Sequence, residues 1–250
     1  MWVSLLLALS SAWAGPLAPV APYRSAQYAA IGHDDVLHCT AFYFKTPGGR
    51  EAPAYVLSAG HCYSRSTGEI FSNTALESQI QFKMGMGEKT PVLFKTRRVA
   101  YSTIKGHDLM IAELAATQAD LERVGITPLE LSESKAQIDD LVELVGFPAN
   151  KESPPQMQRS TGMVTALNPS TSYLPSDFAH SAEGLPGMSG SPIFSLRTGK
   201  VVGINGGGVS HKKDVYLYSF AQFSKSIYGC FDHKGGFSMK RQSCGLRTTK

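Results

Sequence analysis

Short hydrophobic runs bounded by turn residues recur along this chain, and they predict a mainly β protein. The runs are rich in Val, Ile, Phe and Tyr, and clusters of Gly, Pro and Asn separate them. In the first half we expect strands over Val36 to Phe44, Ala54 to Ser58, Ile80 to Met84, Val92 to Tyr101 and Asp108 to Leu114. In the second half we expect strands over Leu141 to Phe147, Gln158 to Leu167, Ser191 to Phe194, Val201 to Ile204 and Val215 to Phe220.

Two segments depart from this β pattern. The spacing of apolar residues over Ala115 to Val124 permits a short helix between the two groups of strands, and Phe220 to Tyr228 predicts a closing helix. A tail rich in Gly and Lys follows, from Phe231 to Lys250.

Residues 1–14 have the pattern of a signal peptide. The run from Trp2 to Leu9 is mostly apolar, and Ala12-Trp13-Ala14 fits a signal-peptidase site, although no Lys or Arg precedes Arg24. We therefore expect a secreted or periplasmic protein in which residues 15–34 form an N-terminal arm or a pro-segment. No later segment approaches the roughly 18 consecutive apolar residues of a membrane span, so we expect no membrane anchor.

Composition and charge add little to this picture. The chain has 250 residues, of which 42% are hydrophobic and 18% charged, as in ordinary globular proteins. The formal net charge of +4 arises from 24 basic and 20 acidic residues spread along the sequence. Because no basic run stands out, we expect no nucleic-acid partner.

Three segments carry residues that together suit nucleophilic catalysis. Ser189 lies between glycines in Gly187-Met188-Ser189-Gly190-Ser191-Pro192, His61 follows an apolar strand, and Asp108 opens another. A serine hydroxyl attacks a carbonyl only if a base takes its proton, and histidine, with a pKa of about 6.5, suits that work. An aspartate on the far ring nitrogen would hold the histidine tautomer.

The order His61, Asp108, Ser189 and the residues that flank them resemble the trypsin-like serine proteases of the chymotrypsin fold. Gly146-Phe147-Pro148, and the glycines from Gly206 to Gly208, look closest to bacterial glutamyl endopeptidase-like relatives. The resemblance implies an all-β fold of two six-stranded antiparallel β-barrels, with the active site in the cleft between them and a short C-terminal helix. It places the N-terminal barrel in residues 35–120, the C-terminal barrel and closing helix in 121–228, and a disulfide-stapled tail in 229–250.

The resemblance also implies roles for further residues. The backbone N–H groups of Gly187 and Ser189 would form the oxyanion hole, where each donor is worth roughly 3 to 4 kcal/mol. An even cysteine count in an exported chain suggests two disulfides, and the family pattern pairs Cys39 with Cys62 and leaves Cys230 with Cys244. A rival metal site at His33, Asp34, Asp35, His38 and Cys39 lacks a second cysteine pair at zinc spacing, so we expect no metal and no cofactor.

Substrate preference is where the sequence leaves alternatives open. Met188 stands where trypsin has an aspartate, so activation by insertion of a new N-terminal amine is not expected. Glu183 falls where trypsin carries its pocket-base carboxylate, and would favour Lys or Arg at the cleavage site, unless it is an exposed loop residue. Asn205 replaces the histidine of glutamyl endopeptidases, and Gly206 and Gly207 would offer backbone groups to a substrate strand.

Together these observations predict a monomeric serine endopeptidase that acts on protein or peptide substrates through an acyl-enzyme on Ser189. The alternative is an inactive trypsin-fold binding module, since Met188 and Gly206 would be tolerable in one.

Overall fold

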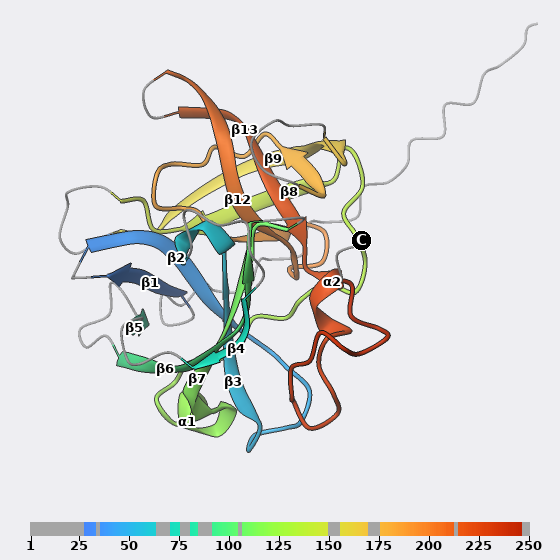
Figure 1. Ribbon diagram of the computed structural model, residues 1–250. Helices are drawn as coiled ribbons and strands as arrows, with labels where there is room; N and C mark the ends of the chain where they lie inside the picture. Colours follow the sequence, from blue (N-terminus) through green and yellow to red (C-terminus); the bar gives the residue numbers. More distant parts are fainter. Residues whose placement is uncertain are drawn as a thin grey trace, which may run out of the picture.

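The structure, a computed structural model, consists of two curved β structures packed side by side, with the C-terminal segment folded against them (Figure 1). It describes residues 28–33, 36–63, 71–75, 81–84, 92–104, 107–149, 156–169, 176–212 and 215–246. The predicted signal peptide lies outside these residues, as does most of the predicted arm. No helix in the described ranges is long and apolar enough to cross a membrane.

The N-terminal sheet contains seven antiparallel strands in the order β4-β6-β5-β1-β2-β3-β7. Strand β6 also pairs with β7, so a ring of six strands closes and β4 adds to the second half of β6. The predicted six-stranded barrel is therefore present, with one strand more. The strands are β1 (Tyr28–His33), β2 (Val36–Phe44), β3 (Pro53–Ser58), β4 (Phe71–Ala75), β5 (Gln81–Met84), β6 (Val92–Thr103) and β7 (Leu109–Thr117).

Strand β1 corrects the predicted domain boundary. We expected residues 15–34 to be an arm outside the barrel, but Tyr28–His33 pairs with both β2 and β5. The sequence signal was weak because the strand contains two alanines and a glycine, which have low strand propensity. Strand β4 was also not predicted, since its centre is the polar run Ser72-Asn73-Thr74.

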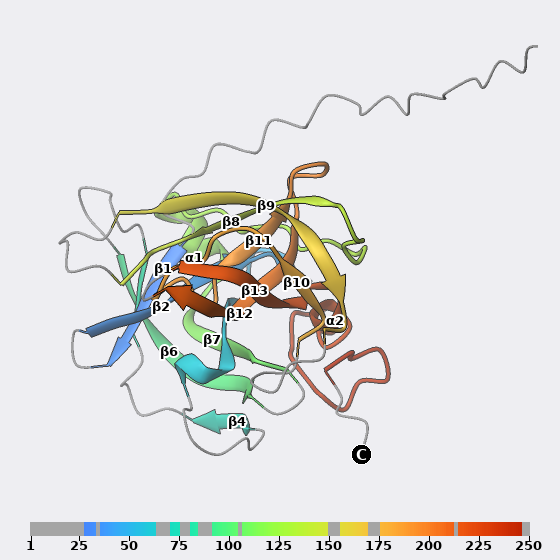
Figure 2. The same cartoon turned by 90° about the horizontal axis from the view of Figure 1, so that it is seen from above.

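The C-terminal sheet is a closed barrel in the order β10-β13-β12-β11-β8-β9, which confirms the second predicted six-stranded barrel (Figure 2). Its three-residue strand β10 was not predicted. The predicted helix from Phe220 starts too early, because residues up to Phe223 pair with β12 and only Lys225–Tyr228 forms helix α2. The strands are β8 (Leu141–Gly146), β9 (Gln158–Leu167), β10 (Phe178–His180), β11 (Pro192–Ser195), β12 (Val201–Lys212) and β13 (Val215–Phe223).

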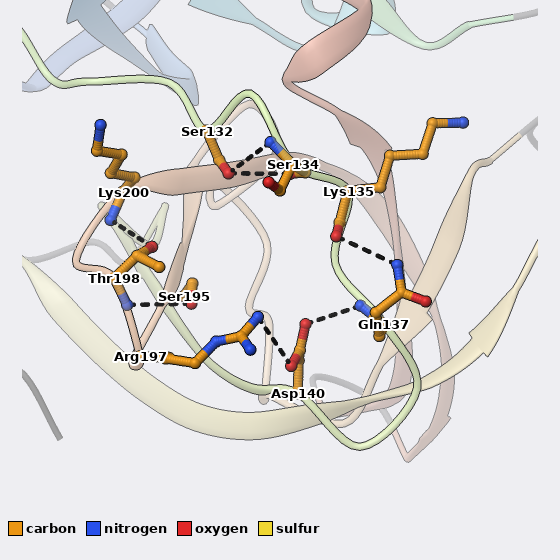
Figure 3. Close-up of polar contacts among 9 residues, drawn as sticks. All are labelled: Ser132, Ser134, Lys135, Gln137, Asp140, Ser195, Arg197, Thr198 and Lys200. Atoms are coloured by element: carbon orange, nitrogen blue, oxygen red, sulfur yellow. Dashed lines mark hydrogen bonds and ion pairs between the residues drawn. The ribbon is translucent and has the colours of Figure 1, made fainter. Parts of the chain in front are cut away.

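Helix α1 (Gln118–Arg123) begins the connection between the barrels, as the apolar spacing predicted. A capping box starts it: Asp120 N–H donates to the Thr117 hydroxyl, and the Asp120 carboxylate accepts from Thr117 N–H. The predicted boundary between residues 120 and 121 thus falls inside a helix. Figure 3 shows how the end of the connection is held, with Asp140 accepting from Gln137 N–H and pairing at 3.6 Å with Arg197 in the β11–β12 turn.

The C-terminal segment is part of the hydrophobic core. The disulfide between Cys230 and Cys244 closes it into a loop, as predicted. Phe231, at its start, packs edge-on against Tyr55 of β3 at 5.0 Å between ring centroids and against Phe44 of β2 at 5.7 Å. The tail therefore packs against the N-terminal barrel, although it follows the C-terminal barrel in the chain.

Candidate active site

His61 lies directly after β3, on a single 3₁₀ turn over Gly60–Cys62. The turn passes so close to the end of β6 that a Cβ atom on Gly60 would lie 2.0 Å from the Thr103 carbonyl oxygen, so only glycine fits there. The predicted disulfide between Cys62 and Cys39 of β2 is present and ties the turn to the barrel. The close approach to β6 and the disulfide to β2 thus together fix the position of His61.

Asp108 binds this histidine with both carboxylate oxygens. Oδ2 lies 2.8 Å from His61 Nδ1, and Oδ1 accepts a 2.9 Å hydrogen bond from the His61 backbone N–H. The aspartate side chain is fully buried, whereas the histidine is 31% exposed. Because a carboxylate only accepts, Nδ1 carries a proton and Nε2 is the ring nitrogen that can act as a base.

Ser189 lies on a tight turn before β11 whose glycines are required by the backbone. Gly187 has φ of +92° and Gly190 has φ of +83°, a region that favours glycine. A Cβ atom would lie 2.2 Å from Ala149 N at Gly187, and 2.2 Å from both Ser58 Oγ and Thr40 O at Gly190. The serine is half-buried rather than enclosed.

A backbone hydrogen bond joins this turn to β2, the strand that the disulfide ties to the histidine turn. The Thr40 backbone N–H donates a 2.8 Å hydrogen bond to the Ser189 carbonyl oxygen. Thr40 follows Cys39, whose disulfide partner Cys62 follows His61. The structure thus places His61 and Asp108 in contact, and it fixes the Ser189 turn to the strand that holds the histidine turn.

Two backbone N–H groups of this turn, those of Gly187 and Ser189, are the ones predicted to form the oxyanion hole. Among the described residues, no hydrogen bond uses the backbone N–H of Gly187 or of Ser189. An oxyanion hole requires two such N–H groups to converge on one oxygen, and the assignment of Gly187 and Ser189 to it stays a prediction.

Of the predicted specificity residues, Glu183 is exposed, and only its backbone N–H is held, by Ser160 Oγ at 2.6 Å. It is therefore not a buried pocket-base carboxylate, and the exposed-loop alternative describes it. Asn205 is 3% exposed on β12, and its Nδ2 donates to the Met188 carbonyl oxygen at 3.0 Å. Gly206 and Gly207 follow it on the same strand, beside β13.

The structure adds a buried histidine that the sequence did not single out. His180 lies on β10 opposite Ser219 of β13 and is fully buried. The Asn205 side chain and the Ala182 backbone are its polar neighbours, but among the described residues neither makes a hydrogen bond of good geometry to the ring. Burial lowers the pKa of His180 to about 4, so the ring is neutral at neutral pH. A single histidine in a three-residue strand gives no sequence pattern that could have revealed it.

A second contact between the barrels supports the aspartate loop. His107, next to Asp108, places Nδ1 2.9 Å from Oε1 of the buried Gln222 on β13.

The only group of potential metal ligands in the described part of the chain is Cys39, His61 and Cys62. Both cysteines are oxidised in the disulfide, so this group is not a metal site. The rival metal set around His33 lies mostly outside the described side chains.

Comparisons with known proteins agree with this geometry. A family model described as a trypsin-like peptidase domain matches residues 39–204. Solved structures of similar fold include the active form of the Rv3671c protease from M. tuberculosis, at 16% identity and TM-score 0.56, with 88% of this chain and 86% of that chain covered.

Two further solved structures have the same TM-score of 0.56. The HtrA-type protease AlgW with a decapeptide is 14% identical, with 80% of this chain and 62% of that chain covered. The thermostable serine protease AL20, from an extremophilic microorganism, is 16% identical, with 80% and 91% covered. At such identities these likenesses show the fold alone, and no curated protein matches the sequence significantly. The narrower likeness to glutamyl endopeptidases stays a prediction.

Proposed function

The chain belongs to the trypsin-like peptidase family of serine endopeptidases, and we propose that it cleaves peptide bonds with Ser189, His61 and Asp108 as its catalytic triad. The observation that carries the proposal is the two-point contact of the buried Asp108 carboxylate with the ring and backbone of His61. In the neutral ring that contact places the proton on Nδ1, so Nε2 is the nitrogen that accepts the serine proton.

The reaction then follows from the groups in place. Ser189 Oγ attacks the substrate carbonyl carbon while His61 Nε2 takes the hydroxyl proton. The carbonyl oxygen becomes negative, and the Gly187 and Ser189 N–H groups stabilise it. His61 gives its proton to the leaving amine, and a water molecule, activated by the same nitrogen, hydrolyses the acyl-enzyme.

Substrate selection in this proposal depends on neutral groups. A Cβ atom on Gly184, next to Glu183, would have as its three nearest neighbours Ser219 Oγ at 3.1 Å, Leu144 Cδ2 at 3.6 Å and Asn205 Nδ2 at 3.7 Å. No charged side chain is among them. We therefore expect the pocket to accept uncharged side chains, and Gly206 and Gly207 to bind the substrate backbone as an added strand.

Export remains part of the proposal. Two disulfides are typical of proteins outside the reducing cytosol. N-terminal sequencing of protein recovered from the periplasm or the medium tests it, because a processed chain would begin at Gly15.

The catalytic proposal is tested by labelling with a fluorophosphonate, which reacts only with an activated serine. We expect the wild type to be labelled at Ser189 and to hydrolyse peptides. Ser189→Ala should not be labelled, and its kcat should fall by a factor on the order of 10⁶. Asp108→Asn is the matched variant: it keeps the geometry and should lose about 10⁴ in kcat through the wrong histidine tautomer.

A folded wild type that takes no label and cleaves no peptide would contradict this function. That result would favour the alternative function, an inactive trypsin-fold binding module. Circular dichroism of each variant establishes that a loss of activity is not a loss of folding.

A further inference from the structure

Four consecutive carbonyl groups of the nucleophile turn are held by donors from outside it. The Pro186 oxygen accepts from Ala149 N–H at 2.7 Å, and the Met188 oxygen accepts from Asn205 Nδ2 at 3.0 Å. The oxygens of Gly187 and Ser189 both accept from Thr40, the first from the hydroxyl at 3.0 Å and the second from the backbone N–H at 2.8 Å.

These contacts determine where the oxyanion donors point. In a planar trans peptide the C=O and the following N–H point in opposite directions. The Pro186 carbonyl therefore fixes the Gly187 N–H, and the Met188 carbonyl fixes the Ser189 N–H. Rotation of either peptide would replace a donor with a carbonyl oxygen, which repels the developing oxyanion.

The Thr40 hydroxyl helps to hold the peptide groups on both sides of Gly187. Its Oγ1 accepts from Phe147 N–H at 2.9 Å, and its single hydrogen has the Gly187 oxygen as its nearer acceptor, at 3.0 Å against 3.5 Å for the Phe147 oxygen. Phe147 begins the segment that ends at Ala149, whose N–H holds the Pro186 oxygen. One hydroxyl thus holds the peptide after Gly187 directly, and the peptide before it through this segment.

The surroundings make the contact strong. Thr40 is fully buried on β2 of the N-terminal barrel, and both groups that its hydroxyl bridges, Phe147 N–H and the Gly187 oxygen, belong to the C-terminal half of the chain. The residue before the nucleophile, Met188, is 1% exposed and apolar, so it offers no charged contact of its own. A buried hydroxyl that bridges two backbone groups leaves both unsatisfied when it is removed.

We propose that Thr40 is a positioning residue for the oxyanion hole: its hydroxyl, supplied by the opposite barrel, holds the Gly187 N–H toward the reacting carbonyl. This inference rests on the proposed function. The N-terminal barrel would then supply the histidine, the aspartate and the hydroxyl that orients the oxyanion hole, and the oxyanion hole itself lies on the C-terminal barrel.

The test compares Thr40→Val, which keeps the shape and removes the hydroxyl, with Thr40→Ser, which keeps the hydroxyl. For the valine variant we expect kcat on a peptide amide to fall about 10- to 100-fold, less than loss of a whole donor costs, while KM changes by less than about twofold. The inhibition constant of a peptide boronate, whose adduct oxygen occupies the oxyanion hole, should rise in parallel with the fall in kcat. The Thr40→Ser variant should have a kcat within about threefold of that of the wild type.

Thr46→Val is the matched control. Thr46 is a buried threonine of the same barrel, and its hydroxyl accepts from Gln118 Nε2 at 3.1 Å instead of contacting the nucleophile turn. We expect this variant to lose stability without losing kcat. If Thr40→Val does not fold, Thr40→Ala removes the same hydroxyl without a branched side chain and takes its place.

The outcomes separate this inference from the proposed function. An active wild type whose Thr40→Val or Thr40→Ala variant, once folded, keeps its kcat and its boronate affinity would overturn the role of Thr40 alone. A serine variant as impaired as the alanine variant would overturn it too. A wild type that neither cleaves peptides nor takes the fluorophosphonate contradicts both proposals.

Discussion

At the scale of single residues, His180 is fully buried, and among the described residues its ring nitrogens make no hydrogen bond of good geometry. Its pKa is lowered to about 4 by burial, whereas an unfolded chain has the ordinary value near 6.5. The unfolded state therefore binds more protons between these values, so stability is complete above about pH 6.5 and decreases as the pH falls to about 4. We expect this loss to approach about 3 kcal/mol. Urea unfolding from pH 7.5 to 4 measures it, with His180→Gln as the variant that cannot titrate; an equal decrease in both proteins would contradict the assignment.

At the scale of elements, the loop between β10 and β11 carries both Glu183 and the proposed nucleophile turn. Glu183 is exposed on this loop, while Asn205 of β12 is buried and bonded to the turn. An exposed carboxylate is screened by water and discriminates weakly between substrates. We therefore expect Glu183→Gln to leave the P1 preference of the enzyme unchanged in a peptide-library profile. A wild-type preference for Lys and Arg that disappears in this variant would show that the carboxylate turns into the pocket when substrate binds.

At the scale of the whole molecule, the C-terminal tail packs against the N-terminal barrel through aromatic rings. Phe231 is 4% exposed and lies within 5.0 to 5.7 Å of three rings, those of Tyr55, Phe44 and Phe237. We expect Phe231→Ala to lower the free energy of unfolding by about 3 to 5 kcal/mol, because the cavity would open in a well-packed cluster. Urea denaturation measures this, with Leu93→Ala as a control at a side chain that is 51% exposed, where we expect about 0.5 kcal/mol or less. Equal midpoints for Phe231→Ala and the wild type would show that the tail adds nothing to stability.

The sequence by itself determined the β class, most strands and both disulfides, and it predicted the residues of the proposed triad. These features depend on local signals: apolar alternation, turn residues, and a serine between glycines whose backbone angles few other residues adopt. It did not reveal β1 or β10, because Ala, Gly and a three-residue strand carry little propensity, and such strands form only when neighbours on both sides pair with them.

Tertiary structure alone decided what the buried polar residues do. Nothing in the sequence around Thr40 or His180 distinguishes them from ordinary strand residues. Thr40 acquires its role because the fold brings Gly187, 147 positions away in the chain, within 3.0 Å of its hydroxyl. Asn205 bonds to the turn and Glu183 lies in solvent for the same reason: burial and hydrogen-bond partners depend on contacts between distant segments, which local residue patterns do not encode.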